Sequence, residues 1–265
     1  MENIVVVGLS GHARVVIDTI ERQGRYRVAG IVDTYRPVGY SCLGHAVLGD
    51  ELCLPDIVRQ NDICGAVVAI GDNWLRHTLV ARIRSIMPGL PFVTVIHPSA
   101  QIADGARVGA GSVILPGAIV CTSADVGEFC ILNTKASLDH DGTMADFSSF
   151  APAVTTGGRV TVKPFAAVML GVNIIDSICI GEHSVVGAGS LVLRDVPAFV
   201  VAYGSPAKVI RTRQPGDPYM GRSSHIKETP FEHNRAATAA NDRLECGDVP
   251  AGHLESQPTL IRDNF

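Results

Sequence analysis

The chain has 265 residues, of which 46% are hydrophobic and 18% are charged, and its formal net charge is −4. This composition predicts a folded protein of one or two domains, and the acidic balance gives no electrostatic case for binding nucleic acid or an anionic membrane surface. The seven cysteines are scattered without a CxxC pair, and no apolar run reaches membrane-spanning length, so we expect a cytoplasmic protein with reduced thiols.

The first ninety residues alternate between strand-like and helix-like stretches. A β-branched run over residues 4–7 is followed by a glycine-containing turn, residues 8–11, and then by apolar residues at helical spacing. A second strand is expected over 28–33 and a third over 66–73, the latter followed by another helix. This order predicts a small doubly wound α/β unit.

The turn after the first strand admits two interpretations. Gly8 and Gly11 would let the backbone approach a phosphate at the start of the helix, and Asp33 lies where an acid usually meets a ribose or a base. The turn lacks the full GxGxxG pattern, however, so an ordinary strand-to-helix turn explains it equally well. Both interpretations stay open from the residues alone.

From Ile102 to Val192 an apolar residue occupies every sixth position, and Thr156 is the one exception. The residue four positions later is usually small, as at Ala106 and Ser112. A strict period of six predicts a parallel β-helix, with three hexads per coil and about five coils. Such a three-sided solenoid favours trimers with clefts between neighbouring subunits.

The stretch SLDHDG places His140 between two carboxylates, Asp139 and Asp141. It is either a general base with an orienting acid or a solvated corner whose acids cap a turn. Leu138 keeps the inward register and Gly142 takes the small-residue position, so we expect the intervening side chains to face outward into a subunit cleft. We expect no metal site in the solenoid, because its only other histidine, His183, lies several hexads away from His140. His183 itself is predicted to be an ordinary turn residue.

Three motifs together resemble the NeuD/PglD-like sugar acyltransferases: the N-terminal GLSGHARVV, the central LNTKASLDHD and the closing GSPAKVIR. The resemblance covers roughly residues 1–212. It implies a Rossmann-like nucleotide-sugar-binding domain over 1–95, followed by a left-handed β-helix over 96–212. It also implies acetyl-CoA as co-substrate and an amino or hydroxyl group of a sugar, often a nucleotide-linked one, as acceptor. Residues 213–265 have no role by this resemblance, and we expect a polar, partly disordered tail in which 215–220 could pack on the prism.

The resemblance also assigns site residues. His140 matches the general base and Asp141 the acid that raises its basicity. The positions implied for the nucleotide sugar are Ser10, Gly11 and His12 at its phosphates, Asp33 and Thr34 at its base or ribose, and Gly71 in the pocket wall. The positions implied for acetyl-CoA are Ser149, Leu170 and Ala188. The family usually carries a histidine where this chain has Ser149, and from the sequence His12 could equally cap the first helix.

The main prediction is a homotrimeric acetyltransferase that acts on the amino group of a nucleotide-linked sugar for surface glycan synthesis. One alternative is O-acetylation of a sugar such as a sialic acid. Another alternative is a non-catalytic nucleotide-sugar-binding or scaffold protein, which is conceivable because Ser149 replaces the histidine usual in the family. Acetylation of serine, known from other hexapeptide proteins, is disfavoured because those enzymes resemble this chain only in the β-helix and carry a helical N-terminal domain.

Overall fold

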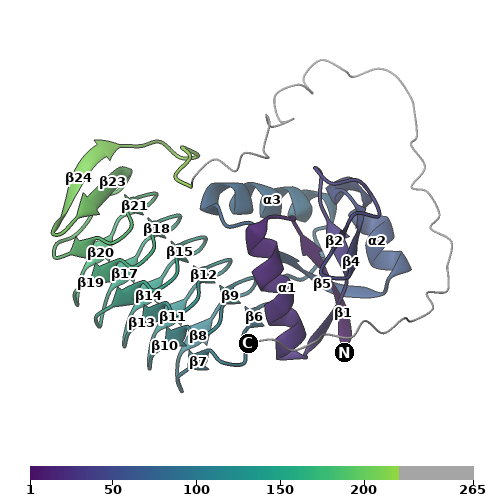
Figure 1. Cartoon of the computed structure of the whole chain (residues 1–265), viewed down its shortest axis with the longest axis horizontal. Helices are drawn as coiled ribbons and strands as arrows, with labels where there is room; N and C mark the ends of the chain where they lie inside the picture. The colour runs from purple at the N-terminus through teal and green to yellow at the C-terminus, as the bar shows by residue number, and fades with distance from the viewer. Residues whose placement is uncertain (221–265) are drawn as a thin grey trace, which may run out of the picture. The chain divides into compact units, whose positions relative to one another are not determined.

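A computed structural model describes residues 1–220, which form an N-terminal α/β domain and a β-helix (Figure 1). The larger part of the predicted tail, residues 221–265, lies outside the described residues. None of the helices in the described part is long and apolar enough to cross a membrane.

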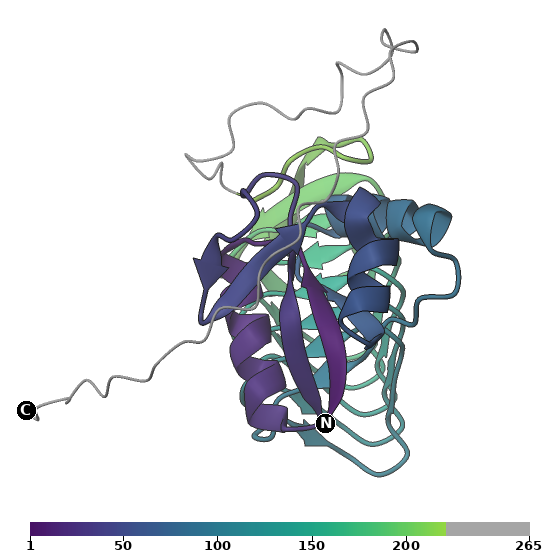
Figure 2. The same cartoon turned by 90° about the vertical axis from the view of Figure 1, so that its right-hand side faces the viewer.

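The N-terminal domain is built on a five-stranded sheet with the order β3-β4-β2-β1-β5. Its elements are β1 (Glu2–Val7), α1 (Gly11–Gln23), β2 (Tyr26–Val32), β3 (Ser41–Cys42), β4 (His45–Gly49), the 3-10 turn η1 (Glu51–Cys53), α2 (Leu54–Gln60), β5 (Ile63–Val68) and α3 (Asn73–Ile86). All pairings are parallel except that of β3 with β4. Helix α1 covers one face of the sheet and α2 and α3 cover the other (Figure 2). The predicted doubly wound unit is confirmed, and β3, β4 and α2 add to it elements that the sequence pattern did not indicate.

The β-helix has three faces, which we number in chain order. The first face contains β7 (Gln101–Ile102), β10 (Ile119–Val120), β13 (Ser137–Leu138), β16 (Thr155–Thr156), β19 (Asn173–Ile174) and β22 (Leu191–Val192). The second face contains β8 (Arg107–Val108), β11 (Asp125–Val126), β14 (Thr143–Met144), β17 (Thr161–Val162) and β20 (Cys179–Ile180). The third face contains β6 (Val95–Ile96), β9 (Val113–Ile114), β12 (Ile131–Leu132), β15 (Ser149–Phe150), β18 (Ala167–Val168), β21 (Val185–Val186), β23 (Val200–Gly204) and β24 (Ala207–Thr212).

Each two-residue strand from β7 to β22 ends on a hexad position, and these residues stack inward as one continuous core. The following corner always contains one residue with positive φ, so that such residues recur at every sixth position from Gly105 to Gly189. The small residue next to it, such as Ala118 or Ala136, is fully buried. The predicted left-handed β-helix is therefore confirmed.

We call the edge between the first and second faces the first corner, the next the second corner, and the edge between the third and first faces the third corner. The second corner carries a column of stacked rings, 18 residues apart except for the last. It consists of Phe129, Phe147, Phe165, His183 and Phe199, with successive ring centroids 4.9, 5.5, 4.5 and 5.3 Å apart. The sequence predicted only an ordinary turn residue at His183. It does lie in a turn, but its buried ring is a member of this column, and burial lowers its pKa.

Helix α3 joins the two domains by packing against this column. Trp74 and His77 lie against the ring of Phe165, with centroids 5.8 and 5.2 Å away. Arg76, which is 1% exposed, crosses the junction. It donates hydrogen bonds to the backbone oxygens of Ile70, Gly71, Phe129 and Phe147 and to the side-chain oxygen of Asn73. Since every N–H of the guanidinium is used, Arg76 fixes α3 to two successive coils.

Candidate active site

The His140 side chain lies in an open groove along the first face of the β-helix. The groove is lined by three consecutive coils, through residues 100–103, residues 119–122, Asp139 and His140. Leu138 points inward and is fully buried, whereas 45% of the His140 side chain is exposed. The expected outward position of this histidine is thus observed.

The two acids that flank His140 make different contacts. The Asp141 carboxylate lies 2.8 Å from the Nδ1 atom of the imidazole. The Asp139 carboxylate instead accepts a hydrogen bond of 2.7 Å from the backbone N–H of His140. Because Asp141 holds one ring nitrogen, Nε2 is the nitrogen left to meet a ligand. The sequence left the choice between the two acids open, and Asp141 is the one on the ring.

Thr156, the one polar residue of the hexad series, supports this turn from the next coil. Its hydroxyl accepts a hydrogen bond of 3.0 Å from the backbone N–H of Asp139, and the pairing between β13 and β16 is limited to Ser137 and Thr155. A side chain thus takes over a ladder hydrogen bond beside His140. The sequence showed that Thr156 interrupts the apolar pattern, but it did not indicate that the Thr156 hydroxyl supports the backbone of Asp139.

Gly158 lies directly over the His140 ring at the same corner. A Cβ atom built at this buried glycine would lie 2.4 Å from both Cε1 and Nε2 of His140, far inside van der Waals contact. The ring can occupy its place only because residue 158 has no side chain. The role of Gly158 could not be predicted from the sequence, because glycines near corners are common in a hexad repeat.

Cys121 is a possible nucleophile that the fold brings into the groove. Burial and a hydrogen bond with Asp139 raise the pKa of its thiol above the ordinary value. A thiol held in this protonated form is a poor nucleophile, since the thiolate is the reactive species. The groove therefore suits direct transfer to an acceptor better than an acyl-enzyme on Cys121.

A second group of predicted residues meets at the carboxyl edge of the N-terminal sheet. Ser10 is the N-cap of α1, yet its side chain caps no backbone N–H and donates instead to the oxygen of Ala69, 3.3 Å away. No acidic residue lies in the first turn of α1, and Gly11 is exposed. The start of α1 therefore offers free N–H groups and a positive dipole end to an anion.

His12 and Arg76 give this edge an unusual polarity. Burial and the nearby Arg76 lower the pKa of His12 to about 4, so its ring is neutral. Its Nε2 atom is buried and has no hydrogen-bond partner among the described residues. The five acceptors of Arg76 are carbonyl and amide oxygens, which leave its positive charge without a hydrogen-bonded carboxylate. An anionic ligand would supply the missing counter-charge.

Asp33 and Thr34 are largely engaged within the protein. The Asp33 carboxylate accepts hydrogen bonds from the backbone N–H groups of Leu9, Tyr35 and Arg36, at 2.7, 2.9 and 2.9 Å. The Thr34 hydroxyl donates to the Glu51 carboxylate at 2.7 Å. Asp33 therefore shapes the loop beside the start of α1, and any contact with a ligand would use its remaining lone pairs.

The positions assigned to acetyl-CoA lie on another part of the β-helix. Leu170 and Ala188 are exposed at the third corner, on successive coils, and Ser149 begins β15 on the third face. His140 lies at the first corner. One chain thus holds the predicted base and the predicted coenzyme contacts on different edges of the same prism.

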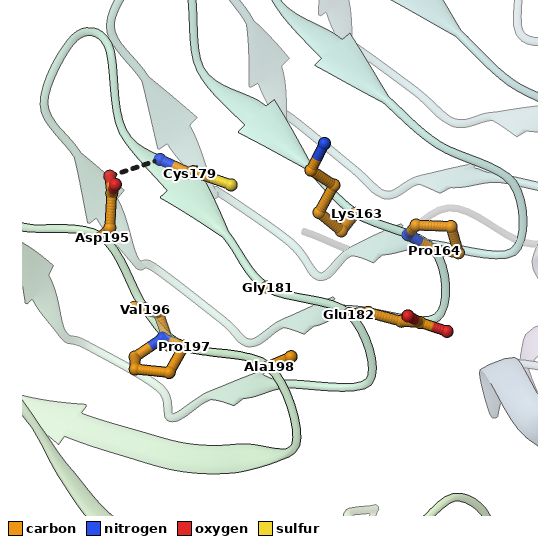
Figure 3. Close-up of a pocket in the computed structure, with 9 residues that line it drawn as sticks. All are labelled: Lys163, Pro164, Cys179, Gly181, Glu182, Asp195, Val196, Pro197 and Ala198. Carbon is orange, nitrogen blue, oxygen red and sulfur yellow. Dashed lines mark hydrogen bonds between the residues drawn. The ribbon is translucent and has the colours of Figure 1, made fainter.

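A further hollow, shown in Figure 3, lies on the second face near the last coils. It is lined by Lys163, Pro164, Cys179, Gly181, Glu182, Asp195, Val196, Pro197 and Ala198. In this hollow the Asp195 carboxylate accepts a hydrogen bond of 2.8 Å from the backbone N–H of Cys179. None of the predicted site residues lines this hollow. Among residues 1–220 no three His, Cys, Asp or Glu side chains are placed to hold a metal ion.

Comparison with known proteins supports the fold and the family resemblance. Residues 3–83 match the family model of the PglD N-terminal domain. PerB from Caulobacter crescentus, solved with CoA and GDP-perosamine, is 36% identical with a TM-score of 0.74, and the match covers 80% of this chain and 98% of PerB. Structures of the same protein in which one histidine is replaced by alanine or asparagine also match.

Two curated relatives match over a smaller part of their length. GDP-perosamine N-acetyltransferase of Escherichia coli O157:H7 is 27% identical over 54% of this chain and 66% of the relative. Serine acetyltransferase 2 of Arabidopsis thaliana is 31% identical over 61% of this chain and 47% of the relative. The chain thus spans between about half and two thirds of these curated relatives. Since nearly all of PerB is matched at 36% identity, the chain belongs to the NeuD/PglD-like family of hexapeptide-repeat acyltransferases.

Proposed function

We propose that this protein transfers an acetyl group from acetyl-CoA to the amino group of a nucleotide-linked sugar, with His140 as general base. The observation that carries the proposal is the His140 ring in the groove, which Asp141 contacts at Nδ1 and Gly158 leaves room for. The names of the matched relatives support the substrate class, since PerB binds CoA and GDP-perosamine. The E. coli relative bears the name of an N-acetyltransferase.

The chemistry needs two proton transfers, one from the acceptor amine to the imidazole and one from the imidazole to the departing thiolate. A hydrogen on Nδ1 donated to Asp141 leaves Nε2 unprotonated, and Nε2 can take the proton of the acceptor amine as its nitrogen attacks the thioester carbon. The carbon–sulfur bond then breaks, and the departing CoA thiolate receives the proton from the imidazole. The raised pKa of Cys121 favours this direct route over a thioester on the enzyme.

The acceptor's nucleotide would bind at the N-terminal domain. The uncapped start of α1, with Ser10 and Gly11, suits a diphosphate, and the uncompensated charge of Arg76 attracts it through space. The buried Nε2 of His12 lacks a partner that such a ligand could provide. Asp33 and Thr34 would lie beside the base or ribose.

An amine is favoured over a hydroxyl by the charge around His140. Asp139 lines the groove and Asp141 lies on the His140 ring, and both carboxylates attract an ammonium group but not a neutral hydroxyl. O-acetylation of a sugar is the second candidate. It has no comparable feature in its favour.

The site would be completed between subunits of a homotrimer. His140 lies at the first corner, whereas Leu170 and Ala188 lie at the third, and a neighbouring prism can bring one corner against the other. The exposure of Leu170 (52%) and of Ile119 in the groove (39%) is consistent with surfaces that a second copy covers.

The test offers the purified full chain acetyl-CoA together with GDP-, UDP- and dTDP-linked amino sugars and their hydroxyl counterparts, while released CoA thiol is followed. We expect turnover with one amino sugar and a loss of about 10²- to 10⁴-fold in kcat for His140→Ala. His45→Ala is a matched control, because His45 forms a similar contact of 2.8 Å with Glu21 outside the groove. Full activity of His140→Ala would remove His140 as the base, and no turnover with any acceptor would favour a scaffold.

A further inference from the structure

The β-helix ends in a hairpin formed by the antiparallel strands β23 and β24, which contains the motif GSPAKVIR of residues 204–211. Figure 1 shows this hairpin in green at the end of the prism opposite β7. β23 pairs in parallel with β21, so that Val201 lies beside Val185. The hairpin therefore continues the third face of the β-helix by one further step.

The turn of the hairpin continues the third corner as well. The backbone N–H of Gly204 donates to the Ser190 hydroxyl at 3.1 Å, and that of Gly187 donates to the oxygen of Ala202 at 2.8 Å. Leu170 and Ala188, the exposed positions predicted to contact acetyl-CoA, occupy this corner on the two preceding coils. The hairpin turn is thus the next part of the molecule that a ligand lying along these positions would meet.

The Tyr203 ring lies directly beside the predicted coenzyme positions. A Cβ atom built at Gly187, the residue before Ala188, would be 3.4 Å from Cγ and 3.6 Å from Cδ1 of Tyr203. The ring therefore rests on backbone that carries no side chain, while 50% of the residue stays exposed. Its neighbour Ala202 is 1% exposed and faces the core, so Tyr203 faces outward.

A lysine accompanies this ring. Lys208 is paired directly with Tyr203 across the hairpin, which puts both side chains on the same side of the two strands. The hairpin contains two cations, Lys208 and Arg211, and no acidic residue. Among residues 1–220 neither cation has a carboxylate within ion-pair distance. Lys208 is exposed, so its charge is available to an anion.

The distance from His140 matches the length of the coenzyme. Three steps of the third face, from β15 through β18 and β21, lead from the coil of His140 to β23. At about 4.8 Å per step this is about 14 Å. The pantetheine arm of CoA, between its thiol and its diphosphate, is about as long as four extended residues, roughly 14 Å. In a symmetric trimer a neighbour's His140 lies at the same height along the prisms.

The chemistry of the far end of CoA also matches the hairpin. This end carries an adenine ring and a phosphate on the 3′ oxygen of its ribose. An exposed aromatic ring provides a surface on which a base can stack, and a lysine ammonium provides a charge for the phosphate. Tyr203 and Lys208 offer these two groups side by side.

We propose that Tyr203 and Lys208 bind the adenosine 3′-phosphate end of the coenzyme, with the tyrosine ring against the adenine and the lysine on the 3′-phosphate. This inference rests on the proposed acetyl-CoA-dependent function. It extends the predicted coenzyme contacts from Leu170 and Ala188 to the end of the β-helix, and it gives a role to the motif GSPAKVIR.

The experiment measures the binding of CoA and of 3′-dephospho-CoA by calorimetry, with the full chain. We expect the wild type to bind CoA about 5- to 10-fold more tightly than 3′-dephospho-CoA, and Lys208→Gln to bind both with the lower affinity. Tyr203→Leu keeps an apolar side chain on Gly187 but removes the aromatic ring. It should weaken the binding of both ligands about 3- to 10-fold and leave their ratio unchanged.

Lys163→Gln is the matched control, because Lys163 is an exposed lysine on the second face, away from the third corner. All three variants should keep the wild-type melting temperature and the wild-type kcat at saturating acetyl-CoA. An undiminished preference for CoA in Lys208→Gln would overturn the role of the lysine, and unchanged affinities in Tyr203→Leu would overturn that of the ring. Either result leaves the proposed function intact, whereas a wild-type protein that binds no CoA would overturn both proposals together.

Discussion

At the scale of single residues, the candidate site arises where the hexad repeat is least regular. Thr156 breaks the apolar series and supports the backbone of Asp139, and Gly158 leaves the space that the His140 ring fills. Asp141 adopts the positive φ that each corner requires and contacts the imidazole from there. The repeat therefore supplies the backbone of the site, including the turn that places Asp141 on the ring, and two local deviations, Thr156 and Gly158, support the His140 turn and make room for its ring.

Gly158→Ala tests the placement of the imidazole. The added methyl group would overlap the His140 ring, so the ring must turn away, and we expect kcat to fall about 10- to 100-fold, as displaced catalytic groups do. Gly158 has no positive φ, so the backbone itself tolerates alanine. Gly89→Ala is the matched control, because a Cβ there meets nothing within 4 Å. Wild-type kcat for Gly158→Ala would show that the observed ring position is not the active one.

His12 predicts a dependence of stability on pH. Its pKa is about 4 in the folded protein against 6.5 in the unfolded chain, so as the pH falls below 6.5 the unfolded chain takes up the proton first. The free energy of unfolding should therefore decrease between pH 6.5 and 4, by about 3 kcal/mol at the limit for this group. His183, whose pKa is also lowered, acts in the same direction.

Urea unfolding at several pH values between 7.5 and 4.5 measures this effect. His12→Gln, which cannot titrate, should lose much of the slope, whereas His97→Gln, at a half-buried turn position, should keep it. Equal slopes for His12→Gln and the wild type would contradict a neutral, buried His12.

At the scale of elements, helix α3 is the part that couples the two domains. Its first turn carries Asn73, which donates to the Tyr219 hydroxyl, Trp74, which lies beside Gly216, and Arg76, which reaches two coils of the β-helix. The column of rings on the second corner provides the surface on which α3 packs. The N-terminal domain and the β-helix are therefore held together by one helix.

Arg76→Met should be strongly destabilising. The substitution keeps an apolar stem but leaves five buried oxygens without their donor, and we expect a loss of about 3–5 kcal/mol in the free energy of unfolding. Arg59→Met is the control, since Arg59 forms only an exposed ion pair with Asp56 and should cost less than about 1 kcal/mol. Thermal unfolding measures both, and a similar small loss in the two variants would contradict the coupling role of Arg76.

The sequence predicted some of these elements better than others, for physical reasons. A strand of two residues is too short to show a hydrophobic pattern of its own. Because the six-residue spacing repeats sixteen times, it nevertheless predicted the position of every strand from β7 to β22. The stacked rings, except for the last, recur every 18 residues. Because 18 residues are also three hexads, this spacing does not stand out from the general repeat of the sequence. The position of Tyr219 could not be predicted, because its hydrogen bond with Asn73 depends on a turn in a segment without periodicity.

At the scale of the whole molecule, the proposed function requires more than one chain. His140 lies at the first corner and Leu170 and Ala188, predicted to contact acetyl-CoA, lie at the third, whereas the residues predicted to contact the nucleotide sugar lie in the N-terminal domain. A trimer brings such parts together at each of its three interfaces, and each site then takes residues from two subunits. This arrangement is the central claim of the account.

Complementation between two inactive variants tests that claim most directly. His140→Ala removes the proposed base, and Leu170→Glu places a charge at the exposed position proposed to contact the coenzyme, without disturbing the core. Each variant alone should be inactive, and co-expressed subunits should recover about a quarter of wild-type activity, because about that share of interfaces pairs two intact halves. Mixed trimers with no more activity than the separate variants would contradict the account, since both residues would then have to act within one chain.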